Sequence, residues 1–292
     1  MIAMASFDFK GSTPHPIVSR ILGTYFIKQS KQPLSIMSSK GIMEAGKVKI
    51  LDLAMATFLK AIPVVPETVL KQCNYMIQRL EKDGTLQMTT IEDVLQEISA
   101  RTLSAEEFGS LMKWFVSLRT KQVISPPLVA RFMESALIPP SYLTSSTSIA
   151  QTSSNNKVAL AAIKSHINVR VIPPDVPLPS DSLPLALGKL FSKGELEQIL
   201  GWAELSIVDW CIYIATEHCR DLEMSAPFSE KILGVVSRVW NSLSQENRAT
   251  IISIFSTKKC IPTRSGMKLP EQSYFKVRKE CSIVILLISG IL

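Results

Sequence analysis

Repeated helix-start signals along the middle of the chain constrain its fold most strongly. Thr90 with Asp93, and Ser104 with Glu107, each place a hydroxyl before an apolar stripe and a carboxylate three residues later. This is the pattern of a capping box. Further helical stripes or starts of the same kind occur at Pro66–Lys82, Ser125–Pro127, Ser192–Glu195, Ser206–Asp209, Ser229 and Ser244. The sequence therefore predicts a mainly α-helical protein.

A stretch of low complexity divides this helical pattern into two blocks. Residues 144–156 hold eight Ser or Thr in thirteen, and four prolines follow between 173 and 179. The first feature favours a linker or surface loop, and the second forbids regular helix. At 292 residues the chain is long enough for two cores. We expect a helical block with an N-terminal hairpin (1–138), a linker with a short helix and strand (139–181), a second helical block closed by a basic hairpin (182–275) and an apolar tail (276–292).

Two short segments near the ends of the helical region share one pattern. IMSSKGIM (36–43) and IPTRSGMK (261–268) each contain an apolar run, three polar residues, a glycine and a second apolar start. A glycine in that position suits a β-hairpin whose backbone needs a positive φ. We therefore expect a small hairpin at each end, with the two related as a repeat.

The second hairpin is the strongest functional candidate in the sequence. Residues 258–279 carry seven basic groups and one acidic group. An order of helices followed by a basic hairpin is typical of a winged helix. In such a domain Lys258, Lys259, Arg264 and Lys268 would contact phosphates. The alternatives are a solvated hairpin, an edge strand protected by lysines, or a winged-helix-like module that docks proteins. The preceding segment 246–253 offers little for reading bases.

Catalytic and metal-binding patterns are weak. The only histidines are His15, His166 and His218, and a Ser-His-Asp or Cys-His arrangement needs neighbours in space that no local pattern here supplies. His218 lies seven residues after Cys211 and next to Cys219, which would put all three on one helical face. Zinc usually takes four ligands, and no second pair is visible. We therefore expect neither a catalytic site nor a metal site.

Other polar and aromatic groups have ordinary structural explanations. The carboxylates of Glu195, Glu197, Glu204 and Asp209 cluster in sequence, but helix N-termini favour acidic residues. Three of the four tryptophans fall on apolar stripes and are expected in the core; they are Trp114, Trp210 and Trp240. No glycine-rich phosphate loop occurs, so we expect no nucleotide cofactor.

The cysteines and the two ends of the chain give expectations about the cellular compartment of the protein. Five cysteines without a C-x-x-C pair favour reduced thiols in the cytoplasm or nucleus. The N-terminus lacks the features of a signal peptide. The uninterrupted apolar run 282–292 is shorter than the ~20 residues that a membrane-spanning helix needs. We expect a buried strand there and no membrane contact.

Several quoted segments together resemble a known family. They are FDFKGSTPHPIVSRI (7–21), PLSIMSSKGIM (33–43), VIPPDVPLPSDSLP (171–184), GWAELSIVDW (201–210) and KKCIPTRSGMKLPEQSYF (258–275). They look like the downstream region of large uncharacterised fungal proteins that begin with a GHKL-type ATPase domain related to chaperone and sacsin ATPases. The likeness covers roughly residues 5–275. The ATPase motifs do not occur here, so no ATP-binding residue carries over. After Phe275 the family pattern continues as a further folded segment, whereas this chain has KVRKECSIVILLISGIL (276–292), so we expect a truncated or mispredicted gene end there.

The resemblance and the lack of a catalytic pattern favour a non-catalytic interaction or scaffold region with protein partners. Nucleic-acid binding through the winged-helix-like hairpins is the alternative. A hydrolase of unknown type, dependent on one of the histidines, is the third class that remains open.

Overall fold

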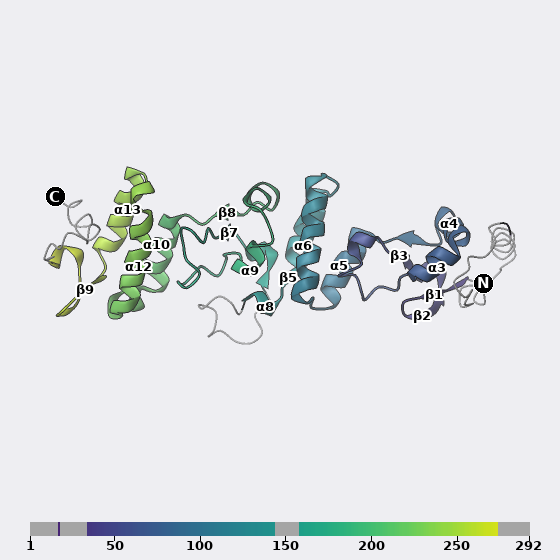
Figure 1. The fold of residues 1–292 in the computed structure, drawn as a ribbon, viewed down its shortest axis with the longest axis horizontal. Coiled ribbons are helices and arrows are strands. Elements are labelled where there is room, and N and C mark those ends of the chain that lie inside the picture. Colours follow the sequence, from purple (N-terminus) through teal and green to yellow (C-terminus); the bar gives the residue numbers. More distant parts are fainter. Residues whose placement is uncertain (1–16, 18–33, 144–157, 274–292) are drawn as a thin grey trace. The chain divides into compact units, whose positions relative to one another are not determined.

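A computed structural model describes residue 17 and residues 34–143 and 158–273. The Ser/Thr-rich stretch and the apolar tail lie outside these ranges, and so does the N-terminal part of the family resemblance apart from Ile17. The chain divides into two compact units, 1–139 and 140–292. Helices dominate both units, and the described strands are short, so the predicted mainly α class is confirmed (Figure 1). None of the helices in the described ranges is long and apolar enough to span a membrane.

In residues 34–139 of the first unit, two strands come first, and three helices precede the last short strand. Its elements are β1 (Ser35–Ser38), β2 (Gly41–Glu44), the 3₁₀ turn η1 (Ala45–Lys47), β3 (Lys49–Ile50), the 3₁₀ turn η2 (Leu53–Met55), α3 (Glu67–Gln72), α4 (Asn74–Lys82), β4 (Gln87–Met88), α5 (Ile91–Ala100), α6 (Ala105–Thr120), α7 (Pro126–Ser135) and β5 (Leu137–Ile138).

The described part of the second unit follows a similar course, with a hairpin before its last 3₁₀ turn. Its elements are α8 (Pro140–Leu143), β6 (Val158–Ala159), the 3₁₀ turn η3 (Leu160–Ala162), β7 (Ser165–His166), α9 (Leu185–Gly188), the π-helical turn η4 (Glu195–Ile199), β8 (Ala203–Glu204), α10 (Ile207–Glu217), α11 (Cys219–Met224), α12 (Ala226–Val239), the 3₁₀ turn η5 (Trp240–Ser242), α13 (Gln245–Ser256), β9 (Ile261–Thr263), β10 (Gly266–Lys268) and the 3₁₀ turn η6 (Pro270–Gln272).

Most of the predicted helix starts are confirmed by their caps. The side chain of Ser104 accepts a hydrogen bond from the amide of Glu107, and the carboxylate of Glu107 accepts one from the amide of Ser104, so the capping box opens α6. Thr90 and Asp93 form the corresponding box at α5. Each box satisfies amide groups that the first helical turn would leave unpaired. Local sequence therefore determines where these helices begin.

Three helix predictions need correction. The helix expected from Ser229 begins earlier, at Ala226, because the hydroxyl of Ser225 caps it. Ser229 instead lies fully buried within α12 and donates to the carbonyl of Cys260. The stripe 66–82 breaks at Cys73 into α3 and α4. The start at 192–195 yields only the short turn η4.

Both predicted hairpins are present and are built in the same way. β1 pairs with β2 and β9 pairs with β10, each antiparallel across a two-residue turn. Gly41 has a φ of 101° and Gly266 a φ of 104°, which glycine adopts without steric cost. The hydroxyl of Ser38 donates to the carbonyl of Gly41 at 2.7 Å, and that of Thr263 to Gly266 at 2.6 Å. The short sequence repeat therefore corresponds to a structural one.

A longer repeat relates the two units. β3 pairs in parallel with β4, and β7 pairs in parallel with β8. An isolated β-bridge joins Val64 to Lys49 of β3, and another joins Ser182 to Ser165 of β7. Each residue of β7 and β8 is numbered 116 above its counterpart in β3 and β4, as the pairs Lys49 and Ser165, Ile50 and His166, Gln87 and Ala203, and Met88 and Glu204 show; the bridge residues Val64 and Ser182 are 118 apart.

The hydrogen bonds around these strands recur at the same offset. The amide of Thr89 donates to the carbonyl of Ile50 at 2.9 Å, and that of Leu205 to His166 at 2.8 Å. The amide of Leu86 donates to Leu80 at 3.0 Å, and that of Trp202 to Leu196 at 2.9 Å. The next helices, α5 and α10, then begin after Thr90 and Ser206, again 116 residues apart. The two units thus repeat one backbone framework, which lets their side chains be compared position by position.

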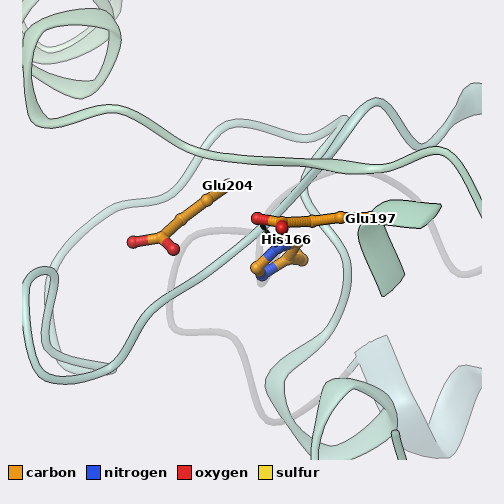
Figure 2. A group of neighbouring side chains, drawn as sticks. All are labelled: His166, Glu197 and Glu204. Atoms are coloured by element: carbon orange, nitrogen blue, oxygen red, sulfur yellow. Dashed lines mark ion pairs between the residues drawn. The ribbon is translucent and has the colours of Figure 1, made fainter. Parts of the chain in front are cut away.

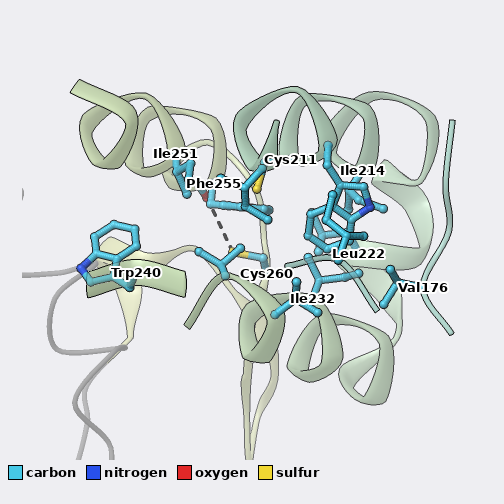
Figure 3. Packing of buried hydrophobic residues seen from close by; sticks show 14 of the residues in the cluster. Val176, Cys211, Ile214, Leu222, Ile232, Trp240, Ile251, Phe255 and Cys260 are labelled. Carbon is cyan, nitrogen blue, oxygen red and sulfur yellow. Dashed lines mark hydrogen bonds between the residues drawn. The ribbon is translucent and has the colours of Figure 1, made fainter. Parts of the chain in front are cut away.

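The core of the second unit lies among α10, α12 and α13 (Figure 3). Its fully buried members include Ile214, Leu222, Ile232, Ile251 and Phe255. The Pro-rich segment belongs to this core too, because Ile172 and Val176 are buried in it and the indole of Trp210 donates to the carbonyl of Pro177 at 2.9 Å. Burial of Trp114, Trp210 and Trp240 confirms their predicted core positions, and Trp202 is also buried.

Candidate functional site

The C-terminal hairpin is held firmly on the second unit. β9 packs against α12, and Ile261 is buried in the core at the start of the strand. The hydroxyl of Thr263 accepts a hydrogen bond from the amide of Ser265 across the turn. Core burial at one end and turn bonds at the other give the hairpin a fixed shape.

The four predicted contact residues lie on and just before this hairpin, but they differ in their surroundings. Lys259 and Arg264 are exposed, whereas Lys258 and Lys268 are partly buried. The ammonium of Lys258 contacts the sulfur of Cys219 at 3.3 Å. Within residues 34–143 and 158–273, no carboxylate pairs with the side chains of Lys259, Arg264 or Lys268. Three cationic groups therefore remain available to a partner, and their assignment as contact residues stays a prediction.

The helix before the hairpin is poorly equipped to read bases. Its one arginine, Arg248, donates to the backbone carbonyls of Trp240 and Asn241 at 3.0 and 3.1 Å. Its guanidinium also lies over the Trp240 ring, 5.9 Å from the centroid. These contacts fix the side chain against its own unit.

A second polar group forms where β7, β8 and η4 meet (Figure 2). Donor atoms of His166, Glu197 and Glu204 lie within 4.8 Å of one another. The His166 side chain is only 6% exposed, and its Nε2 has no hydrogen-bond partner among the described residues. Oε1 of Glu197 lies 3.4 Å from Nε2, as an ion-pair contact without hydrogen-bond geometry.

Lys193 and Asn168 complete this polar group. The ammonium of Lys193 lies 2.6 Å from Oε2 of Glu204 and 3.6 Å from Oε1 of Glu197. The amide of Asn168 donates to Oε1 of Glu204 at 3.0 Å. These contacts, led by the hydrogen bond from Lys193, hold the pKa of Glu204 below its ordinary value. The carboxylate thus stays ionised, with one oxygen bonded to Lys193 and the other to Asn168.

Sequence reasoning noted the histidine and the two glutamates but did not bring them together. It counted the glutamates with Glu195 and Asp209, which the structure assigns to helix starts through their contacts with Ser192 and Ser206. The pairing of β7 with β8 brings His166 next to Glu204 across 38 positions of sequence. No local pattern reports that contact.

The arrangement expected for Cys211, His218 and Cys219 is not present. The helix breaks at His218, which ends α10 and precedes α11. Its ring instead contacts the Tyr213 hydroxyl at 3.1 Å and Oδ2 of Asp221 at 3.3 Å. Cys211 is fully buried, and burial raises its pKa to about 12. These three side chains therefore do not share a face. His15 lies outside the described residues.

Comparison with known families gives one match, across almost the whole chain. The model of a family described as protein of unknown function, DUF3684, matches residues 1–279, and the chain belongs to that family. No curated protein and no solved structure matched the chain.

Proposed function

We propose that this member of the DUF3684 family is a non-catalytic interaction region that contacts a protein partner through its C-terminal hairpin. One observation carries the proposal, namely the fixed hairpin and the residue before it, where Lys259 and Arg264 are exposed, Lys268 is partly buried, and none of the three has an acidic partner in the described part of the chain. Unpaired charges on a rigid surface steer and orient a complementary partner at little entropic cost. The partner surface that fits is acidic.

The resemblance to proteins with a GHKL-type ATPase domain adds a role for this contact. In such a protein the region would pass changes in the nucleotide state of the ATPase to other proteins. The chain itself would contribute binding and no hydrolysis. The absence of ATPase motifs from its sequence supports the proposal that this region binds partners and that a separate domain hydrolyses ATP.

Charge reversal at the hairpin tests the proposal. The double variant Arg264→Glu with Lys268→Glu should lose proteins that the unchanged chain captures from a nuclease-treated extract, because like charges would then face an acidic partner. The matched control is Arg170→Glu with Lys189→Glu, two exposed positions of the same unit with the same change in net charge. Quantitative mass spectrometry of the eluates gives the comparison. Equal capture by all three proteins would refute a role for the hairpin.

Nucleic acid is the second candidate, because helices lead into a basic hairpin as they do in winged-helix domains. The ordering of α10, α12 and α13 before β9 favours it, whereas the internally bonded Arg248 disfavours base reading.

Fluorescence anisotropy with duplex DNA and with single-stranded RNA decides this case. If the hairpin binds phosphates, the affinity should fall steeply with salt, with a logarithmic slope of about −0.9 per phosphate contact on duplex DNA. Replacing Arg264 with Ala should then make that slope shallower by about 0.9, the contribution of one phosphate contact. Absence of binding at low salt would eliminate nucleic acid and leave the protein partner.

A further inference from the structure

His166 is an unusual residue for its position. The side chain is more than nine-tenths buried, and its Nε2 faces the two glutamates without a hydrogen bond. Buried polar atoms in native proteins are nearly always satisfied, so an unpaired one calls for a ligand or a functional reason. The remaining donors at this place are carboxylate oxygens, which accept hydrogen bonds or bind cations.

The first unit shows that the backbone framework does not need this polar group. At the 116-residue offset, Ile50 stands in place of His166, and Met88 in place of Glu204. Ile50 is buried in the core of its own unit. Lys193 likewise corresponds to the buried Ile77, whereas Glu197 corresponds to Glu81. Three apolar positions of the first unit thus carry a histidine, a lysine and a glutamate in the second, whereas Glu197 keeps the acidic residue of its counterpart. The framework of the first unit forms without these three polar groups, although Met88 there is 44% exposed.

We propose that His166, Glu197 and Glu204 bind one divalent transition-metal ion, with zinc as the ion that best fits the donors. An imidazole nitrogen and two carboxylate oxygens are ordinary zinc ligands, and three protein ligands leave a fourth position for water. Donor atoms within 4.8 Å of one another need only small side-chain movements to reach one ion. Glu197 and Glu204 are 35% and 25% exposed, so the ion has a route from solvent.

Neighbouring groups support the same reading. The side-chain amide of Asn168 donates a hydrogen bond to Glu204, in the way that outer-shell residues orient metal ligands. The ammonium of Lys193 already lies against both carboxylates, which shows that this place favours a positive charge. Its side chain is 64% exposed, so an arriving metal ion can displace it into water with little loss. Lys193 is thus a competitor of the metal ion and a substitute for it when the metal is removed.

Competition with a chromophoric chelator measures the binding. Protein stripped with EDTA should take up one zinc ion per chain at this site. The variant His166→Ile, which copies the residue of the first unit, should weaken that binding by more than about 100-fold, because losing an outer-shell partner alone costs about 10–100-fold. Lys193→Met should instead tighten it, since the competing ammonium is gone. If the cluster had only a structural role, the two variants would not change zinc affinity in opposite directions.

Cobalt separates this site from the thiols of the chain. The cobalt-loaded protein should show the visible bands of a site with nitrogen and oxygen ligands, without thiolate charge transfer. Circular dichroism confirms that each variant is folded, and Glu204→Gln provides a second ligand change of nearly the same shape. The proposal is overturned if zinc affinity is unchanged in both His166→Ile and Glu204→Gln, if a thiolate band accounts for the cobalt, or if the stripped protein binds no metal.

Discussion

Replacing Arg101 with Met should lower the free energy of unfolding of the first unit by about 3–5 kcal/mol, because it leaves the buried carboxylate of Glu97 without its counterion. The guanidinium of Arg101 donates to Glu97, to Glu107 at 2.7 Å and to the carbonyl of Phe58 at 2.7 Å. The Glu97 side chain is fully buried and also accepts the amides of Lys60 and Ala61. Denaturant unfolding followed by circular dichroism measures the loss.

A matched control separates this effect from the loss of any arginine. Arg131 makes a two-pronged contact with Glu92, but both side chains are more than half exposed. Arg131→Met should therefore cost no more than about 1 kcal/mol. Similar losses in the two variants would contradict the importance of burial.

The pH dependence of stability gives the Arg101 network a second signature. Hydrogen bonds from Arg101, with help from Lys60 and Ser104, lower the pKa of Glu107 to about 2 from an ordinary 4.5. A carboxylate with a lowered pKa in the folded state stabilises the protein above its ordinary pKa, and this contribution is lost as the pH falls. The loss should thus occur between about pH 4.5 and 2, and it should be smaller in Arg101→Met.

Replacing His166 with Ile should raise the stability of metal-free protein by about 1–3 kcal/mol, the usual cost of an unsatisfied buried polar group. The isoleucine would restore the residue that the same framework carries at Ile50. Zinc should narrow or reverse this difference, because a ligand that binds only the folded state adds about 2.7 kcal/mol at 100 times its dissociation constant. Thermal unfolding with EDTA and with zinc makes the comparison. A wild-type protein that is more stable than the variant in EDTA would show that the histidine serves the fold.

Sequence reasoning succeeded where a few neighbouring residues determine the structure. The capping boxes at Thr90 and Ser104 and the glycines of both hairpins are such cases. It failed at Ser229, because Ser225 is an equally good cap four residues earlier and the hydroxyl of Ser229 has a partner, Cys260, that lies 31 positions away.

The cluster of His166, Glu197 and Glu204 was out of reach for the same reason, since long-range strand pairing assembles it. The 116-residue repeat is only weakly visible in the amino-acid sequence. TTIED (89–93) and LSIVD (205–209) share a cap, an isoleucine and an aspartate, but the paired strand positions differ in chemical character, as Ile50 with His166 and Met88 with Glu204 show. Hydrogen bonding of the backbone preserves the framework without preserving those side chains, so a repeat of this kind becomes visible only in the structure.

Hydrogen exchange of the hairpin in a complex tests the proposed interaction most directly. The proteins eluted in the charge-reversal experiment provide the partner, and exchange is compared between the free chain and the complex. We expect slower exchange centred on residues 258–268, because a bound partner shields the hairpin amides from water. Slower exchange elsewhere with an unchanged hairpin would contradict the account, because the partner would then bind a different surface of the chain.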